Sequence, residues 1–195
     1  MITQKEFDEI SSKFNKIEDS RDSIWIRAEK LLHEGYVIDA YLLILATWNF
    51  ARFRYAMKEF DLKGFEKTVT VLEPSFSKLK NDRFESVNFD IHKKEISVIY
   101  NELAKIKGVE FTGATKLMAL KNSNLFVMWD TGIRKMYNKK LERSKKIPQR
   151  PCGLDYVDFL IYLREEFSDV KVSDKNKSLA KAIDEYNYVK AEEYR

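Results

Sequence analysis

The stretch Ile106–Arg134, with the sequence IKGVEFTGATKLMALKNSNLFVMWDTGIR, decides how we expect the chain to fold. It contains a glycine-bounded hairpin at 107–113, a short helical pattern, an apolar run and a new helix start at Asp130. Gly108 and Gly113 permit positive φ angles and a close approach of the main chain to a partner. The N–H groups of such a turn, with the N-terminus of the next helix, suit a phosphate oxygen.

Helical patterns also dominate on both sides of this stretch. The 195 residues include only 6 glycines and 3 prolines, which favours long helices with few breaks. Apolar residues recur at spacings of three and four, the pattern of amphipathic helices. Helices are expected at about 3–17, from 22 to the Gly35 stop, 37–60, 65–72, onward from Pro74, 90–106, 114–120, 130–138, 154–167 and 178–190. We therefore predict one all-α domain, a compact multi-helix fold over residues 1–195.

The composition predicts no metal and no cofactor. Cys152 is the single cysteine, so an intramolecular disulfide and a cysteine-ligated zinc or iron–sulfur centre are excluded. Neither His33 nor His92 has other ligand-type residues at metal-ligand spacing. The most apolar stretch, 37–46, is too short for a membrane span, and the N-terminus lacks the apolar run of a signal peptide. We expect a cytoplasmic protein without a membrane partner, and the sequence leaves its oligomeric state open.

The net charge of +4 is concentrated in one part of the chain. Between Thr131 and Arg150 a single acid, Glu142, stands against a block of basic residues: Arg134, Lys135, Lys139, Lys140, Arg143, Lys145, Lys146 and Arg150. Such a block is typical of a surface that faces a polyanion. A solvated lysine-rich loop at 139–150 that binds nothing is the alternative interpretation.

Basic and aromatic residues alternate in the segment 49–60, NFARFRYAMKEF. This pattern has two interpretations. It can place aromatic rings for stacking on nucleic-acid bases. It also fits a half-buried helix with Phe50, Phe53 and Met57 inward and the charges outward, which we expect here.

The order of features after Lys107 resembles a known family. A hairpin with Gly108 and Val109, a short helix, the run LFVMW and the helix start Asp-Thr-x-Ile-Arg at 130–134 follow one another. This order resembles the core of the helix-hairpin-helix DNA glycosylase superfamily, which includes endonuclease III and its adenine- and alkyl-base-excising relatives. The resemblance covers about residues 106–134. It implies a glycosylase-like fold in which Asp130 is the catalytic carboxylate and Gly108 the hairpin glycine.

The resemblance also implies a nucleic-acid surface, with DNA as the expected partner and RNA left open. Its residues would be Lys107, Gly108, Gly113, Lys116, Arg134, Lys139, Lys140, Arg143, Lys145 and Lys146. Glu110 stands where the family has its second hairpin glycine, and Phe111 and Thr112 are nearest to the position of the Schiff-base lysine of bifunctional members. Lys116, one helical turn further on, is a second candidate catalytic residue. Base excision without lyase activity is therefore the expected chemistry.

The sequence is compatible with three roles for Asp130. A carboxylate beside C1′ of a nucleotide stabilises positive charge on the sugar. An aspartate before a helix is also an ordinary N-cap, and a ligand-binding role without hydrolysis is the third. The function is correspondingly a monofunctional glycosylase, a non-catalytic helix-hairpin-helix nucleic-acid-binding protein, or a helical protein-interaction module. The last would use C-terminal aromatics, namely Tyr186, Tyr188 and Tyr194, unless these pack on the N-terminal helix.

Overall fold

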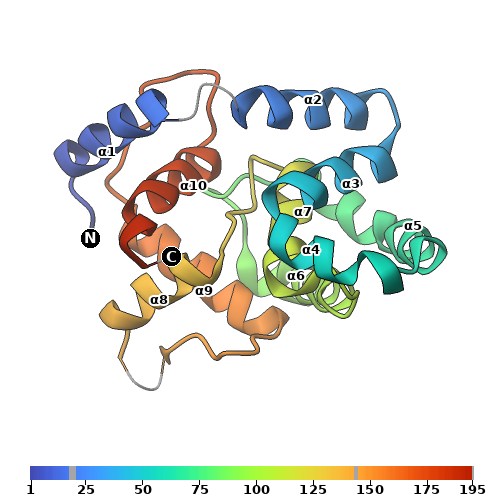
Figure 1. Cartoon of the computed structure of the whole chain (residues 1–195). Helices are drawn as coiled ribbons and strands as arrows, with labels where there is room; N and C mark the ends of the chain where they lie inside the picture. The colour runs from blue at the N-terminus through green and yellow to red at the C-terminus, as the bar shows by residue number, and fades with distance from the viewer. Residues whose placement is uncertain (18–20, 143–144, 195) are drawn as a thin grey trace.

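The computed structural model describes residues 1–17, 21–142 and 145–194, and within these ranges the chain forms helices and no strand (Figure 1). The all-α prediction is confirmed. The helices are α1 Gln4–Ile17, α2 Arg21–His33, α3 Val37–Trp48, α4 Phe50–Ala56, η1 Met57–Glu59, α5 Leu62–Leu79, α6 Phe89–Ala104, α7 Glu110–Lys121, α8 Thr131–Lys140, α9 Gly153–Glu166, α10 Leu179–Lys190 and η3 Glu192–Tyr194. None of these helices combines the length and apolar character needed to cross a bilayer.

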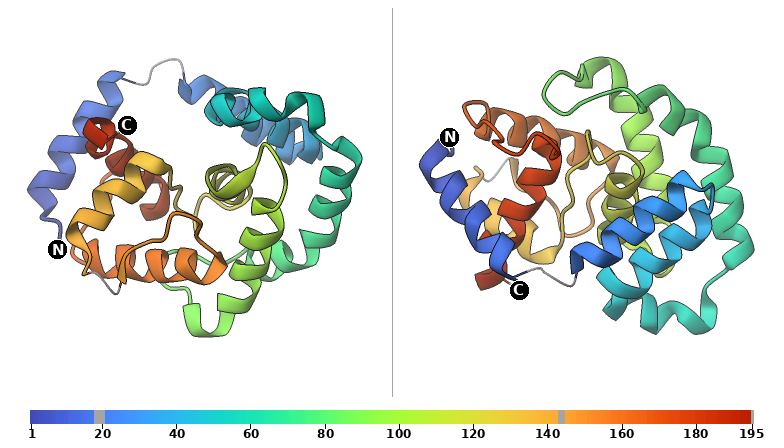
Figure 2. Two further views of the ribbon diagram at one scale, coloured as in Figure 1. Left: turned by 60° about the horizontal axis from the view of Figure 1, so that its bottom comes forward. Right: turned by 90° about the horizontal axis from the view of Figure 1, so that it is seen from above.

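The helices form two groups, which Figure 2 shows from two further directions. One group contains α1, α8, α9 and α10, with α1 lying along α10. The other contains α2 to α7, in which α2 pairs with α3 and α6 with both α5 and α7. Helix α9 packs on α6 and joins the two groups. Between α7 and α8 the chain passes from the second group to the first through the segment that leads to Asp130.

That crossing segment, residues 125–129, is the buried apolar run LFVMW. It is neither helix nor strand, so its backbone polar groups need partners from elsewhere in the core. Side chains from three helices supply them: the Thr115 hydroxyl accepts from Trp129 N–H at 3.2 Å, the Tyr156 hydroxyl donates to Val127 C=O at 2.8 Å, and the Asp184 carboxyl accepts from Met128 N–H at 2.5 Å. The backbone just before Asp130 is therefore fixed by α7, α9 and α10 together.

Trp129 anchors the end of this segment in an aromatic cluster. Its ring is fully buried, and its centroid lies 5.8 Å from that of Tyr100, 5.1 Å from that of Tyr156 and 5.1 Å from that of Phe159. Ring pairs at such separations add to the free energy gained by burial. Since Asp130 follows Trp129 directly, the cluster limits where the Asp130 backbone can lie.

The predicted continuous helix over 37–60 is wrong, because the chain breaks at Asn49. This side chain is buried, and its Nδ2 donates to the carbonyl oxygens of Gly108 at 2.9 Å and Val109 at 3.2 Å. The break changes which side of the following helix faces the core. Phe53 is buried as expected, but Phe50 and Met57 are 54% and 57% exposed rather than inward.

The two helices expected around Pro74 are one helix, α5. Proline removes one backbone hydrogen bond and usually bends or ends a helix. Here the buried face continues across it, with Leu72 before Pro74 and Phe76 after it. Packing of this face against α6 holds the helix together through the proline.

Tyr186 and Tyr188 pack on the N-terminal helix, one of the two placements that the sequence left open, while Tyr194 lies against Lys139 of α8. The Tyr186 ring stacks on Phe7 with centroids 5.9 Å apart, and its hydroxyl donates to Glu6 at 2.8 Å. Tyr188 meets Phe14 edge to face, with centroids 6.0 Å apart. These contacts join α10 to α1 and bury the Tyr186 ring.

Candidate functional site

The turn between α6 and α7 is shorter than predicted. Helix α6 ends at Ala104 and α7 begins at Glu110, so the connection is 105–109 instead of 107–113. Gly108 lies in the turn with φ +91°, and a Cβ there would lie 2.9 Å from Cβ of Ala56. This position therefore requires glycine for both its backbone conformation and its packing.

Gly113 does not belong to the turn, which corrects its expected place in the hairpin. It lies within α7, where its N–H donates to the carbonyl of Val109 at 2.9 Å. A Cβ at Gly113 would come within 2.9 Å of Asn49 Nδ2. Its small size lets Asn49 and α3 approach α7, and its amide is already bonded within the helix.

Glu110 adopts φ +52°, the left-handed region that favours glycine. It is the position at which the resembled family has its second hairpin glycine. The Glu110 carboxylate accepts from Arg52 of α4 at 2.6 Å. The acid beside the turn is therefore paired with a cation.

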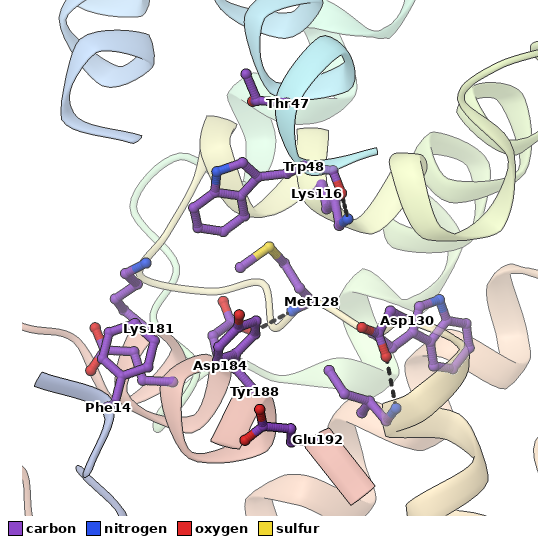
Figure 3. Close-up of a pocket in the computed structure, with 13 residues that line it drawn as sticks. Phe14, Thr47, Trp48, Lys116, Met128, Asp130, Lys181, Asp184, Tyr188 and Glu192 are labelled. Carbon is purple, nitrogen blue, oxygen red and sulfur yellow. Dashed lines mark hydrogen bonds between the residues drawn. The ribbon is translucent and has the colours of Figure 1, made fainter. Parts of the chain in front are cut away.

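Asp130 combines two of its predicted properties. It is the N-cap of α8, where its Oδ1 accepts from the N–H of Ile133 at 2.8 Å. It is also half-buried at the wall of a pocket of about 550 Å³ (Figure 3). An N-cap role and a place in a ligand site are therefore compatible for this residue.

The pocket lies between the two groups of helices. In Figure 3, Trp48 and Lys116 face it from one side and Asp184 and Tyr188 from the other, with Asp130 at one end. The lining residues are Phe14, Thr47, Trp48, Lys116, Met128, Trp129, Asp130, Ile133, Lys181, Asp184, Glu185, Tyr188 and Glu192. A volume of this size is typical of sites for small molecules and cofactors.

The pocket wall is aromatic and carries more acids than bases. Its charged side chains are the carboxyl groups of Asp130, Asp184, Glu185 and Glu192 and the amines of Lys116 and Lys181. Lys181 lies over the rings of Trp25 and Trp48, 4.5 Å and 5.7 Å from their centroids. A flat ring with amino groups suits this wall better than a phosphate does, because carboxylates repel anions.

The fold brings Lys116 into the pocket that Asp130 lines. Lys116 lies on α7, lines the same pocket and donates from Nζ to the backbone carbonyl of Trp48 at the end of α3. This bond links α7 to the end of α3 on one side of the pocket (Figure 3). Both candidate catalytic residues therefore lie in one pocket.

Asp184 is a pocket residue that the sequence did not single out. Most aspartates are exposed, but the side chain of Asp184 is only 5% exposed. Burial raises the pKa of its carboxyl group to about 8, against the lowering effects of Lys181 and of the hydrogen bond from Met128. Its position in the sequence gives one indication of this burial. Asp184 follows Ile183 and lies four residues after Ala180, and both of these residues are on the buried face of α10.

The predicted basic residues divide into two sets on the surface. Lys107 pairs with Glu59 next to the turn. Lys139 lies 4.4 Å from the centroid of the Tyr194 ring, and Lys140 is 3.7 Å from Glu166. The other described lysines of the loop, Lys145 and Lys146, are exposed, and Arg143 lies outside the described residues.

The basic loop begins well away from Asp130 and then returns toward it. Helix α8 puts Lys140 about 15 Å from the helix start at 1.5 Å per residue. Arg134 then donates to the carbonyl oxygens of Pro148 at 3.4 Å and Gln149 at 3.3 Å, which holds the end of the loop along α8. Burial lowers the pKa of the Arg134 guanidinium group.

Exposed aromatic and basic side chains also lie on α4, beside the turn. Phe50 and Tyr55 are 54% and 88% exposed, and Arg54 lies over the Phe50 ring at 5.9 Å. Ala56 of the same helix contacts Gly108, so this surface adjoins the turn. The stacking interpretation of segment 49–60 therefore has rings available at the surface.

In the described ranges no group of three or more His, Cys, Asp or Glu side chains is placed to hold a metal ion. Comparison of the chain with protein-family models, with curated proteins and with solved structures gives no match.

Proposed function

We propose that this protein is a DNA-glycosylase-like nucleic-acid-binding protein that removes a base from DNA, with Asp130 as its catalytic carboxylate. The observation that carries the proposal is the position of Asp130. It caps α8 and at the same time lines a pocket of about 550 Å³ that also contains Trp48 and Lys116. An N-cap without a ligand role does not require such a pocket.

DNA would bind across the surface that contains the turn 105–109, α4 and the loop after α8. The Glu110 N–H already donates to the Ile106 carbonyl at 3.1 Å, so a phosphate oxygen would bind the N–H groups that follow it in the first turn of α7. Lysines at both ends of this surface would add the charge that phosphate binding requires. Exposed Phe50 and Tyr55 are suited to stack on unpaired bases.

The target nucleotide would have to leave the duplex to reach Asp130, since stacked bases are inaccessible. As the bond between C1′ and the base nitrogen breaks, positive charge develops on the sugar, and the Asp130 carboxylate stabilises it. A water molecule then forms the new bond to C1′, and its proton goes to the departing base. No lysine is available at 111–112, so the proposed reaction stops at the abasic site.

The same surface supports a second candidate, a nucleic-acid-binding protein without catalysis. Glu110 at the turn and the acidic pocket wall favour it, because both differ from a strongly cationic DNA site. A protein-interaction module is less supported. The Tyr186 ring that it would use is buried against α1.

Binding is tested by the salt dependence of affinity for a fluorescent DNA duplex. We expect affinity to fall steeply with salt, and the variant Lys139/Lys140/Lys145/Lys146→Ala to reduce the slope by about 1 for each lysine that contacts a phosphate. Lys5/Lys13→Ala, on the exposed side of α1, is the control for lost net charge. Absence of DNA and RNA binding at low salt would exclude both nucleic-acid functions.

A further inference from the structure

The carboxyl group of Asp184 is held in a fixed orientation inside the pocket. Its Oδ1 accepts a hydrogen bond from the Met128 N–H at 2.5 Å (Figure 3). The side chain is 5% exposed and lines the pocket wall opposite Trp48. A ligand that enters the pocket can bond to the other carboxyl oxygen, Oδ2, and the hydrogen bond from Met128 holds the group in place for it.

Ionisable groups surround Asp184 on every side. They are Lys181, Glu185 and Tyr188 of α10, Tyr156 of α9, Lys116 of α7, Asp130 at the start of α8 and Glu192 of η3. Glu185 is paired with Lys177 at 2.5 Å. Burial, and to a smaller extent the charge of Glu185, opposes ionisation of Asp184 and raises the pKa of its carboxyl group.

A protonated carboxyl group offers one donor and one acceptor side by side. This pair matches an amidine edge, in which a ring nitrogen accepts and a neighbouring exocyclic amine donates. Adenine and cytosine carry such an edge. Uracil can also form two hydrogen bonds with a protonated carboxyl group, through its ring N–H and a carbonyl oxygen. It differs in its two carbonyl oxygens, whose partial negative charge is unfavourable near the acids Asp130 and Glu192 of the pocket.

We propose that Asp184 is a specificity-determining residue that binds the amidine edge of an amino-bearing nucleobase, such as adenine or cytosine, while Trp48 provides an aromatic wall for the ring. The inference rests on the proposed function in assuming that the pocket receives a base. Asp184 donates from Oδ2 to the ring nitrogen and accepts from the amine. The target of the protein is accordingly an amino-bearing base.

The test is a calorimetric titration of the intact protein with free adenine, cytosine, uracil and unsubstituted purine. We expect adenine to bind about tenfold more tightly than unsubstituted purine, the factor for one hydrogen bond. Adenine and cytosine should also bind more tightly than uracil, because the uracil carbonyl oxygens lie near acids. Asp184→Ala should lose the difference between adenine and purine. Equal affinity for uracil and adenine, or the absence of binding by any free base at millimolar concentration, would overturn the inference.

A second variant separates recognition from folding. Asp184→Asn keeps an acceptor for Met128 N–H and offers a donor at every pH, so it should retain adenine binding. In the wild type, affinity for adenine should fall as the pH rises through about 8, the pKa of the free carboxyl group, while in Asp184→Asn it should stay constant. Asp158→Asn, at an exposed position on α9, should follow the wild type.

Identical pH profiles for the wild type and Asp184→Asn would remove Asp184 from recognition even if the pocket binds bases. The readout is also independent of base excision. Excision from DNA without selective binding of free bases would contradict this inference and leave the proposed function intact. Selective binding of free bases without excision would support this inference and contradict the proposed catalytic function.

Discussion

The Asp184 carboxyl group on α10 accepts a 2.5 Å hydrogen bond from the backbone N–H of Met128, two residues before Asp130. The buried Asp184 side chain thus holds the backbone segment that leads to Asp130, the candidate catalytic carboxylate. The contact joins the two groups of helices at the pocket wall. It also makes the stability of the fold depend on the ionisation state of Asp184.

We predict that the free energy of unfolding falls between about pH 4 and about pH 8. The pKa of Asp184 is raised from 3.8 to about 8 in the folded state. In this range the folded protein holds a proton that the unfolded chain releases, so a higher pH favours unfolding. Above about pH 8 the contribution of this group is constant. Urea unfolding at several pH values measures the slope.

Asp184→Asn provides the comparison for this prediction, because an amide does not titrate. Its stability relative to the wild type should rise steadily from about pH 5 to about pH 8. Parallel pH curves for the two proteins would show that Asp184 is not the titrating group.

Glu110→Gly should be more stable than Glu110→Ala. Both variants lose the exposed pair with Arg52, which is worth at most about 1 kcal/mol. Alanine keeps the unfavourable φ of +52°, and glycine relieves a conformational cost of about 1–2 kcal/mol. Chemical denaturation of the two variants measures the difference. The opposite order would mean that the turn does not hold this residue in the left-handed region.

Gly153→Ala should destabilise the contact between α6 and α9. A Cβ at Gly153 would lie 2.4 Å from Ser97 Cα and 2.5 Å from its carbonyl oxygen, so the backbone of one helix must move. Overpacking of this kind costs about 1–3 kcal/mol or more. The matched control is Leu154→Ala at the exposed neighbouring position, which we expect to change stability by about 0.5 kcal/mol or less. Thermal denaturation measures the stability of both variants. Equal stability losses in the two would contradict the predicted clash at Gly153.

Arg134→Ala should release the end of the basic loop. The guanidinium group donates to the carbonyl oxygens of both Pro148 and Gln149, at 3.4 Å and 3.3 Å. Together these two hydrogen bonds contribute about 1 kcal/mol. Their loss should raise the rate of tryptic cleavage after Lys145 or Lys146 about fivefold. Lys135→Ala on the exposed side of α8 serves as the control. Unchanged cleavage would show that other contacts hold the loop.

The parts of the site that sequence predicts are those set by local chemistry. Asp130 was expected to begin a helix, and it caps α8 because a short carboxylate side chain reaches the N–H of Ile133. The rest of the pocket comes from residues far away in the chain. Trp48 on α3 and Asp184 on α10 line one pocket although they are far apart in the chain, and no local pattern encodes that arrangement.

The break at Asn49 is another feature that the local sequence does not predict. Residues 37–60 have the apolar content of a continuous helix, but Asn49 gains buried hydrogen bonds with the carbonyl groups of the turn. A tertiary contact with residues 108–109 thus ends the helix that local propensity would extend. The exposure of Phe50 follows from it and was not predictable from the segment alone.

The most direct test of the central claim is base release by the wild type and by Asp130→Asn. Asparagine caps helices as well as aspartate does, so the variant should fold normally and lose only the charge. The wild type should generate alkali-labile abasic sites in at least one duplex of a damaged-base panel. Asp130→Asn should do so at least about a hundredfold more slowly. Equal release by both proteins, or none by the wild type from any duplex, would contradict the assignment of Asp130 as the catalytic carboxylate.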